Sequence, residues 1–331
     1  MRALVLHAPW DLRLEELEVP SPGRGWLRMA VRRVGICGTD KALYSGDYGA
    51  RRLPLILGHE VSGEVVEVGE GVSESLLGSR VTTEINVTCN ECWFCRSGMR
   101  EHCLRREAIG ISLDGGMAEY MLTRGDLVHS IEGLSWQQGA LVEPLAAVLK
   151  PFMMSPPRPL SSVAVVGVGT VGLLSLQVAR IYEPERLVAV YRSESRKVLL
   201  AKRYGAEVVR LEEALELRRE VNEGVGFDLV IEATGSPDGL ETALELVRAR
   251  GKVFAKSTHG KRVCFDYTRA VVNEVSIVGS RCGPFRQAIE LLRRGRVSVD
   301  ELVTSVYPLE EGVEAMRRSF DRDQVKVQLE V

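Results

Sequence analysis

The sequence predicts an α/β protein in which a doubly wound parallel sheet is joined to a second, β-rich domain. Three observations lead to this fold class. From residue 161 onward, short apolar runs alternate with helix-like segments, as they do when crossover helices join parallel strands. Before about residue 133 the chain consists instead of short β-like runs broken by Gly, Pro and Asp. The proline-rich segment SPPRPL, at 155–160, separates the two patterns.

The individual elements follow from these patterns. The first part contains the β-like runs LRMAVRRVG, SGEVVEVG, SRVTTEI, GMAEYMLT and DLVHSI. A helix-like segment from Gln138 to Phe152 comes next and is expected to be regular only up to Pro151. The alternating region then supplies the strands VAVVG, LVAVY, AEVVR, FDLVIEAT, GKVFAKS and VSIVGS, with helical segments between the first five of them.

The end of the chain is predicted to complete the first domain. It reads as a helix at FRQAIELLRRG, a short strand, another helix and a terminal strand, KVQLEV, that could return to the first domain. We therefore expect residues 1–154, completed by 284–331, to form the β-rich domain. Residues 155–283 are expected to form the doubly wound domain.

Composition favours a globular protein of the cytoplasm. The 331 residues are 45% hydrophobic, enough for a sizeable core, and the length suggests two domains. The net charge is only -2 and the sequence contains no blocks of like charge, so neither nucleic acid nor a membrane surface is expected as a partner. The N-terminus alternates apolar and charged residues, unlike a signal peptide, and the cysteines are odd in number, which argues against full disulfide pairing.

One apolar stretch, from Val163 to Ile181, is nearly long enough to span a bilayer. Its glycines lie at spacings that a spanning helix does not require, and a strand-like run, LVAVY, follows it. A buried strand–helix–strand unit is therefore the better interpretation.

Four of the seven cysteines, Cys89, Cys92, Cys95 and Cys103, lie within fifteen residues. The C-x2-C-x2-C spacing of the first three lets a tight loop bring their sulfurs together, and the fourth can complete a tetrahedron around Zn²⁺ with bonds of about 2.3 Å. Four thiolates leave the ion no open position, so such a site is structural. The alternatives are disulfides, a redox pair, buried thiols or an iron–sulfur cluster, but cysteines three residues apart form strained disulfides.

A second candidate metal site comes from Cys37, in VGICGTD, and His59, in LGHEVSGEVVEVG. About twenty residues of β-like chain separate the two, enough for the chain to turn back and bring them together. Each residue alone is weak evidence, because single cysteines and histidines are often core or structural residues. A cysteine, a histidine and one carboxylate, with one position left for solvent, are the ligands of a catalytic zinc.

Six motifs occur in a fixed order along the chain: GICGTD, GHE-x2-G-x-V-x-x-V-G, the four-cysteine loop, DGGMAEY, VEPLA and GVGTVG. This set covers essentially the whole chain and resembles the zinc-containing medium-chain alcohol dehydrogenase family, which includes sorbitol, threonine and glucose dehydrogenases. The resemblance implies that the doubly wound domain is a Rossmann domain that binds a dinucleotide. It also implies that the β-rich domain is a GroES-like catalytic domain.

The resemblance also implies a set of ligands for the catalytic zinc. Cys37 and His59 match two of them, and the third is a carboxylate. Glu143, in the VEPLA segment, matches the glutamate of the polyol and threonine enzymes, whereas Glu60 matches a glutamate that ligates directly in some members. The sequence leaves both glutamates open, and a plain helix-terminal charge is the alternative for Glu143.

The resemblance also implies roles for two further residues of the first motif. Asp40 is implied to hydrogen-bond the second nitrogen of the ligand histidine, which fixes its tautomer. Thr39 is implied to pass the proton of the substrate hydroxyl towards solvent. Many members end this relay in a histidine, but KALYSGDYG has none, so Lys41, Tyr44 or water must serve, or the relay runs differently.

The GVGTVG segment predicts the dinucleotide site, because it follows the strand SSVAVV and opens a helix. Its glycines let the backbone approach a pyrophosphate at the positive end of that helix. The position that selects between NAD and NADP, about twenty residues on, is Tyr191 or Arg192, and neither is acidic. Arg192 and Ser193, with Arg196 nearby, could bind a 2′-phosphate, so NADP is favoured and NAD remains possible.

The resemblance adds residues from later loops, some under the adenosine half and some beside the nicotinamide, while His259 is expected to cap its own loop. The complete set expected to bind the dinucleotide is Gly167, Gly169, Thr170, Val171, Gly172, Tyr191, Arg192, Ser193, Arg196, Ala233, Thr234, Gly235, Ser257 and Thr258.

The sequence thus predicts an enzyme with one catalytic zinc, one structural zinc and NADP or NAD as cofactors. Its expected reaction is the oxidation of a polyol, sugar or secondary alcohol, or the reverse reduction of a carbonyl, by hydride transfer. A simple alcohol or threonine-type dehydrogenase and a non-catalytic zinc- and nucleotide-binding protein are the alternatives. The strand VSIVGS resembles the edge through which family members pair, so a homodimer or homotetramer is expected.

Overall fold

The computed structural model describes all residues, 1–331, and the chain forms two compact units. The β-rich unit contains Met1–Glu143, Phe285–Arg293 and Leu302–Val331, and the parallel-sheet unit contains Pro144–Pro284 and Arg294–Glu301. The expected division after residue 154 lies eleven residues from the one at Glu143, since helix α4 (Val142–Met154) itself contains the point where the units separate.

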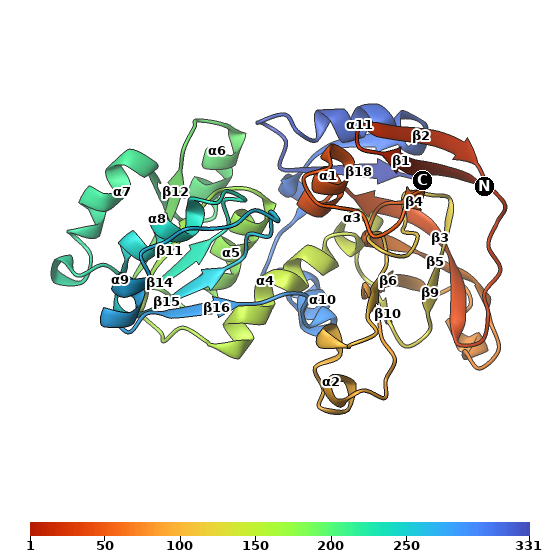
Figure 1. Cartoon of the computed structure of the whole chain (residues 1–331), viewed down its shortest axis with the longest axis horizontal. Helices are drawn as coiled ribbons and strands as arrows, with labels where there is room; N and C mark the ends of the chain where they lie inside the picture. Colours follow the sequence, from red (N-terminus) through yellow and green to blue (C-terminus); the bar gives the residue numbers. More distant parts are fainter. The chain divides into compact units, whose positions relative to one another are not determined.

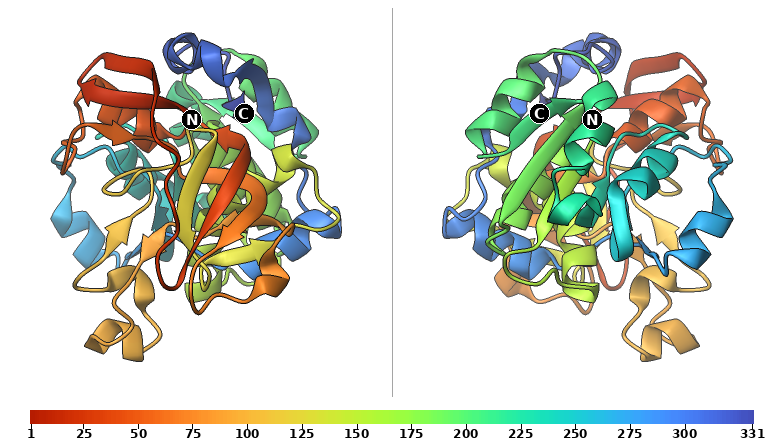
Figure 2. Two further views of the ribbon diagram at one scale, coloured as in Figure 1. Left: turned by 90° about the vertical axis from the view of Figure 1, so that its right-hand side faces the viewer. Right: turned by 90° about the vertical axis from the view of Figure 1, so that its left-hand side faces the viewer.

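The β-rich unit is built on a seven-stranded sheet with the strand order β10-β6-β5-β3-β18-β17, and β9 also pairs with β3. A three-stranded sheet, β2-β1-β4, and a short pair, β7-β8, complete it. Figure 2 shows its strands as curved ribbons beside one another. The strands are β1 (Arg2–Ala8), β2 (Asp11–Glu16), β3 (Trp26–Gly35), β4 (Leu55–Ile56), β5 (Glu60–Val68), β6 (Arg80–Thr83), β7 (Asn86–Val87), β8 (Glu107–Ala108), β9 (Tyr120–Arg124), β10 (Val128–Ser130), β17 (Val303–Pro308) and β18 (Lys326–Glu330).

Alternation of side chains builds the core of this unit. In β3, Leu27, Met29 and Val31 are buried, whereas the residues between them are partly exposed. Successive side chains of a strand point to opposite faces, so an apolar residue at every second position covers one face. The β-rich domain, predicted from short β-like runs broken by Gly, Pro and Asp, is thus confirmed.

The terminal strand returns to the β-rich unit, as expected. β18 pairs antiparallel with β3, with Gln328 opposite Gly35, and parallel with β17. The Ile36 N–H also donates to the Val327 carbonyl at 2.9 Å. The end of the chain therefore lies directly beside the segment that leads into Cys37.

Short helices connect these strands. The helix expected from Gln138 is instead two helices, α3 and α4, and α4 continues past Pro151 to Met154. Pro151 has no N–H and cannot donate to the Ala147 carbonyl, four residues earlier in the helix. The Lys256 ammonium donates to this carbonyl instead, at 2.9 Å, so the carbonyl still has a hydrogen-bond partner. The helices of the unit are α1 (Gly38–Ser45), α2 (Trp93–Arg96), α3 (Trp136–Gly139), α10 (Phe285–Arg293) and α11 (Gly312–Arg318), with single 3-10 turns at Glu74–Leu76, Arg100–His102 and Leu309–Glu311.

The parallel-sheet unit has the strand order β13-β12-β11-β14-β15-β16, and every neighbouring pair is parallel. The order reverses at β11, which confirms the doubly wound fold. Helices α5 and α6 pack together against the sheet, and α7 and α8 form a second pair (Figure 1). No helix of the chain combines the length and the hydropathy that crossing a membrane requires.

The elements of this unit follow the expected alternation, except that a helix, α9, also lies between the last two strands, where none was expected. Its strands are β11 (Ser162–Val166), β12 (Arg186–Tyr191), β13 (Glu207–Arg210), β14 (Phe227–Glu232), β15 (Val247–Ala255) and β16 (Ser276–Gly279). Its helices are α5 (Thr170–Arg180), α6 (Arg196–Arg203), α7 (Leu211–Arg218), α8 (Gly239–Leu246) and α9 (Tyr267–Val272), with 3-10 turns at Asn222–Gly224 and Asp300–Leu302.

Candidate functional site

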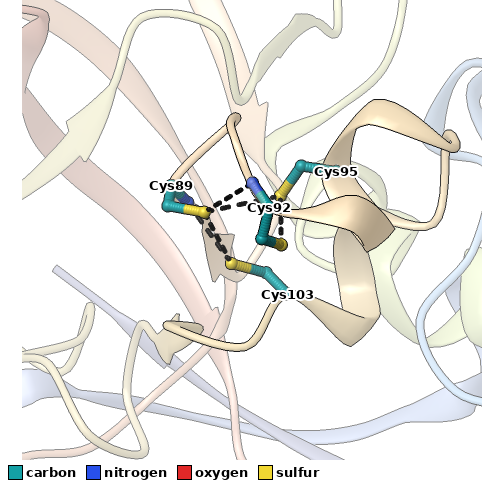
Figure 3. A group of neighbouring side chains, drawn as sticks. All are labelled: Cys89, Cys92, Cys95 and Cys103. Atoms are coloured by element: carbon teal, nitrogen blue, oxygen red, sulfur yellow. Dashed lines mark hydrogen bonds between the residues drawn. The ribbon is translucent and has the colours of Figure 1, made fainter.

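The four-cysteine loop forms a compact cluster of sulfurs, as its spacing predicts (Figure 3). The four Sγ atoms lie within 4.8 Å of one another, and no disulfide joins them. Cys89 is 3.9 Å from Cys95 and 3.4 Å from Cys103, and Cys92 is 3.5 Å from Cys95. Tetrahedral ligands on bonds of about 2.3 Å are about 3.8 Å apart, so this cluster matches the size of a zinc tetrahedron.

Backbone donors favour thiolates in this cluster. The Cys92 N–H donates to the Cys89 sulfur at 3.4 Å, and the Arg105 N–H donates to the Cys103 sulfur at 3.4 Å. Although burial opposes it, the Cys92 N–H and the thiols of the other three cysteines lower the pKa of Cys89 to about 6. Burial and the same neighbours raise the pKa of Cys95 to about 11. Neighbouring thiolates thus make it harder for one another to ionise. A divalent cation would remove this effect, because it stabilises all four thiolates at once.

A buried carboxylate joins the two segments that carry Cys37 and His59. Asp40 is completely buried, and its Oδ2 accepts from the Cys37 N–H at 2.7 Å. Its Oδ1 accepts from the Gly58 N–H at 3.2 Å. One side chain therefore fixes both the start of α1 and the turn before His59, which brings the two expected metal ligands to one place.

The imidazole of His59 lies in this same buried region. Its Nδ1 is 3.4 Å from Asp40 Oδ1 but makes no hydrogen bond of good geometry, so it is a buried polar atom without a partner. Burial lowers the pKa of His59, but the charges of Asp40 and of the nearby Cys37 outweigh it and raise this pKa well above its ordinary value. A thiol and an imidazole that lie together beside a buried carboxylate fit a zinc ion.

Glu60 has a different partner that the sequence analysis missed. It is buried and forms an ion pair with buried Lys326, whose ammonium lies 2.8 Å from Oε1 and 2.6 Å from Oε2. The same ammonium donates to the Ile36 carbonyl at 3.1 Å, so all three of its hydrogens have acceptors. Burial lowers the pKa of Lys326, but Glu60 and the nearby Cys37 outweigh it and raise this pKa.

The other expected catalytic residues come from two helices. Glu143 is buried in the first turn of α4 and belongs to the β-rich unit, and Thr39 lies in the first turn of α1. The four cysteines are the only group of three or more Cys, His, Asp or Glu side chains close enough to share an ion. Cys37 and His59 are thus brought together, whereas neither glutamate completes such a group with them.

The residues expected to end the proton relay are both engaged in other contacts. The Lys41 ammonium donates to the Ser319 carbonyl at 3.2 Å and lies 5.3 Å from the centroid of the Phe320 ring. Tyr44 is buried, with its ring packed edge-on against Trp10. These contacts hold both side chains of α1 against neighbouring elements.

The glycine-rich turn after β11 has the shape that the sequence predicts. Gly167 has a φ of +99°, and a Cβ there would lie 2.6 Å from the Ala233 carbonyl oxygen. A Cβ on Gly172 would lie 1.9 Å from the Gly167 carbonyl, whereas a Cβ on Gly169 would meet nothing within 4 Å. Two glycines are thus needed for packing, and the third leaves open space at the N-terminus of α5, where a pyrophosphate can approach.

A buried glutamate ties the next two loops together. Glu232, at the end of β14, accepts from the Thr234 N–H at 2.9 Å and from the Ser257 hydroxyl at 2.6 Å. The Ser257 hydroxyl in turn accepts from the Gly235 N–H at 2.7 Å. His259 caps its own loop, as expected, since its Nδ1 accepts from the Lys261 N–H. Thr234, Gly235 and Ser257 therefore lie at one edge of the parallel sheet, whereas nothing in the sequence singled out Glu232.

The turn after β12 carries the residues expected to choose between the two dinucleotides. Arg192, Ser193 and Arg196 are exposed there. Tyr191 is buried, and its hydroxyl donates to Glu194 at 2.6 Å. The remaining predicted residues, Thr170 and Val171 at the start of α5, Ala233 after β14 and Thr258 after β15, lie at the same carboxyl edge of the sheet.

Comparison with known proteins agrees with both units. Residues 23–133 match the alcohol dehydrogenase GroES-like domain, and residues 170–294 match the zinc-binding dehydrogenase family. D-arabitol-phosphate dehydrogenase of Enterococcus avium is 31% identical, with 95% of this chain and 92% of the relative covered. D-arabinitol dehydrogenase 1 of Uromyces fabae is 32% identical, with 99% and 96% covered.

Solved structures share the whole fold. A zinc-binding dehydrogenase from Sinorhizobium meliloti 1021, bound to NADP, is 30% identical with a TM-score of 0.91, and the match covers 100% of this chain and 99% of that one. An alcohol dehydrogenase from Escherichia coli CFT073, complexed with NADH, is 25% identical with a TM-score of 0.92, with 100% and 99% covered.

Proposed function

Since the chain belongs to the zinc-containing medium-chain alcohol dehydrogenase family, we propose that it is a dehydrogenase that oxidises a polyol or sugar alcohol with NADP or NAD. One observation carries this proposal. Asp40 binds the backbone on both sides of the candidate site and so brings the Cys37 thiol and the buried His59 imidazole together. A thiol, an imidazole and an acid are the ligand set of a catalytic zinc.

Cys37, His59 and Glu143 are the residues that would hold this ion. Glu143 is the better third ligand because both oxygens of Glu60 are already bound by the Lys326 ammonium. Turning Glu60 to the ion would leave that ammonium buried without its counter-charge, which is costly. A zinc ion in this site supplies Lewis acidity, which lowers the pKa of a substrate hydroxyl.

The chain's own residues would position and deprotonate the substrate. Thr39, two residues after Cys37, would accept the proton of the substrate hydroxyl and pass it on through its own hydroxyl. Lys41 and Tyr44 are held by contacts with Ser319 and Trp10, so we propose that solvent water receives the proton. The glycine-rich turn would hold the dinucleotide, whose nicotinamide would supply the hydride acceptor.

The dinucleotide is proposed to be NADP. The two exposed arginines of the turn after β12, Arg192 and Arg196, form no ion pair, and guanidinium groups recognise phosphate oxygens with paired hydrogen bonds. Loop residues Thr234 and Ser257, fixed by Glu232, would support the remainder of the cofactor.

A sugar alcohol or its phosphate is the proposed substrate class. By their names, the two relatives above act on arabitol phosphate and on arabinitol, and their matches cover more than nine-tenths of this chain. Glutamate at the third ligand position, in VEPLA, supports the same class. We propose the cytoplasm as its location, because all seven cysteines are free thiols and reducing compartments preserve these.

A second copy of the chain is the proposed partner at the edge strand β16. Ile277 on this strand is 39% exposed, and Val271 and Val272 of the preceding helix α9 are more than half exposed. An uncovered strand edge with apolar side chains is a site for pairing with another strand. A homodimer would bury it.

The function is tested by metal analysis and a substrate screen on the full-length protein. Two zinc ions per chain are expected, together with NADP⁺ reduction on arabitol, sorbitol or their phosphates that chelation abolishes. The Cys37→Ser variant should lose one zinc and all turnover, and Cys264→Ser, at an exposed cysteine elsewhere, is the matched control. One zinc per chain in the unmodified protein and no turnover on any alcohol would refute the proposal.

A further inference from the structure

The turn after β12 contains one carboxylate, and that carboxylate is already engaged. Glu194 accepts from the Tyr191 hydroxyl at 2.6 Å and from an Arg210 guanidinium nitrogen at 3.4 Å. Arg210 reaches it from the neighbouring strand, because β12 and β13 are parallel with Tyr191 opposite Arg210. The guanidinium carbon lies 6.0 Å from the centroid of the Tyr191 ring. We call these three residues the Glu194 latch.

The two arginines of the same turn, unlike Glu194, have no partner of opposite charge. Arg192 and Arg196 are exposed and form no ion pair with Glu194 or with any other acid. Within the segment 191–197, which runs from the end of β12 into α6, Glu194 is the single acidic residue. The turn therefore presents two unpaired positive charges, while its negative charge is compensated by a residue from the next strand.

This difference matters because the end of the second strand is where the adenosine ribose is recognised in such sheets. A carboxylate there accepts hydrogen bonds from the two ribose hydroxyls of NAD, and an arginine there binds the 2′-phosphate of NADP. A free Glu194 could perform the first task, and it would repel a phosphate. Because Tyr191 and Arg210 both bind Oε1, Glu194 no longer offers both of its oxygens to the ribose hydroxyls, and Arg210 compensates the charge that would repel a phosphate.

We propose that the Glu194 latch is a specificity device: Tyr191 and Arg210 withhold Glu194 from the ribose, so the turn selects a 2′-phosphorylated dinucleotide. The inference rests on the proposed dehydrogenase function and adds the residues that decide between its two cofactors. Tyr191 and Arg210 are therefore positioning residues, which act through Glu194. The hydrogen bond also raises the pKa of Tyr191, so the hydroxyl stays protonated and keeps donating.

The test compares binding of NADPH and NADH to the zinc-loaded protein by fluorescence titration, together with kcat/KM for the oxidised forms. Tyr191→Phe removes the donor and should weaken NADPH binding about three- to tenfold, while NADH binding stays equal or improves. Arg210→Ala should shift the ratio in the same direction. Glu194→Gln removes the charge itself, so the double variant Tyr191→Phe with Glu194→Gln should regain the original preference.

Tyr204→Phe is the matched control, because the Tyr204 hydroxyl, in the same unit, has no hydrogen-bond partner and its loss should leave both affinities unchanged. The latch is overturned if Tyr191→Phe keeps the ratio of the two affinities within a factor of two. It is also overturned if the unmodified protein prefers NADH. A protein that binds neither dinucleotide would instead refute the proposed function, so the two failures are distinguishable.

Discussion

Replacing Lys326 by Met tests whether the buried pair with Glu60 holds the candidate metal site together. Lys326 is 4% exposed and Glu60 is 1% exposed, so the substitution leaves a carboxylate in the protein interior without its counter-charge. Methionine fills a similar volume, and the loss is therefore electrostatic rather than a cavity effect. Removing one partner of a buried ion pair costs about 3–5 kcal/mol.

This cost should appear in thermal unfolding of the β-rich unit. A destabilisation of 1 kcal/mol lowers the melting temperature of a unit of this size by about 2–4 °C, so a fall of roughly 6–20 °C is expected. The double variant Glu60→Gln with Lys326→Met removes both charges. It should be more stable than the sum of the two single changes predicts, by at least about 1 kcal/mol, because contacting residues are not additive.

Metal content distinguishes a local electrostatic effect of Lys326→Met from unfolding of the whole β-rich unit. In Lys326→Met the released Glu60 side chain is free to compete with Glu143 for the ion, so the cobalt-substituted protein should show an altered visible spectrum while the four-cysteine site keeps its metal. Arg318→Met is the matched control, because Arg318 also pairs with an acid of the β-rich unit, Glu314, but both side chains are exposed. Exposed pairs contribute about 0–1 kcal/mol, so this control should change stability little and the spectrum not at all. A Lys326→Met protein within about 1 kcal/mol of the original would refute this account of the pair.

Three further outcomes follow from the structure. Cys103→Ser should reduce zinc from two ions to one per chain and unfold the four-cysteine loop, as judged by protease cleavage near residue 100, while Cys264→Ser should not. Glu232→Gln places an amide against the Ser257 N–H and should raise the dissociation constant for NADPH about five- to hundredfold. The constant is measured by titration, and Glu241→Gln, at a glutamate that also accepts from a backbone N–H, is the control. Although burial opposes it, hydrogen bonds from Ser162, Arg248 and Asn222 lower the pKa of Asp228, so its contribution to stability is present above its unfolded pKa and is lost as the pH falls below about 4. Because solvent partly screens this side chain, Asp228→Asn should cost about 1–2 kcal/mol at pH 7 and much less at pH 3 in urea unfolding, and an equal cost at both values would contradict the assignment.

Elements with a local signal could be predicted from the sequence. The parallel sheet follows from alternation, because right-handed crossovers leave few ways to arrange six strands and their helices. The sulfur cluster follows from spacing, since Cys89, Cys92 and Cys95 lie on one short loop. The glycine-rich turn follows from sterics, because Gly167 and Gly172 each lie where a Cβ would meet a carbonyl group.

Residues whose role depends on a partner far along the chain could not be predicted. Lys326 meets Glu60 across 266 residues, and the registers of β18 and of β5 against β3 bring them together. Neither side chain carries a sign of this pairing, because a lysine in a terminal strand is usually exposed. The sequence therefore left both glutamates of the candidate zinc site open, and the buried ion pair of Glu60 is the observation on which we base the proposal of Glu143 as the ligand.

The two candidate metal sites differ in how they are built, and this difference explains which of them is complete without an ion. The four cysteines come from one loop, so local chain geometry alone brings their sulfurs within 4.8 Å. Cys37 and His59 come from different parts of the chain and are brought together by the pairing of β3 with β5 and by Asp40, while the candidate third ligand, Glu143, comes from the start of another helix. A closed site of local origin is suited to hold a loop in shape, whereas a site assembled from separate elements can leave one position open for an alcohol. The structural role that we propose for the first site and the catalytic role that we propose for the second are thus both supported by the same comparison of chain geometry.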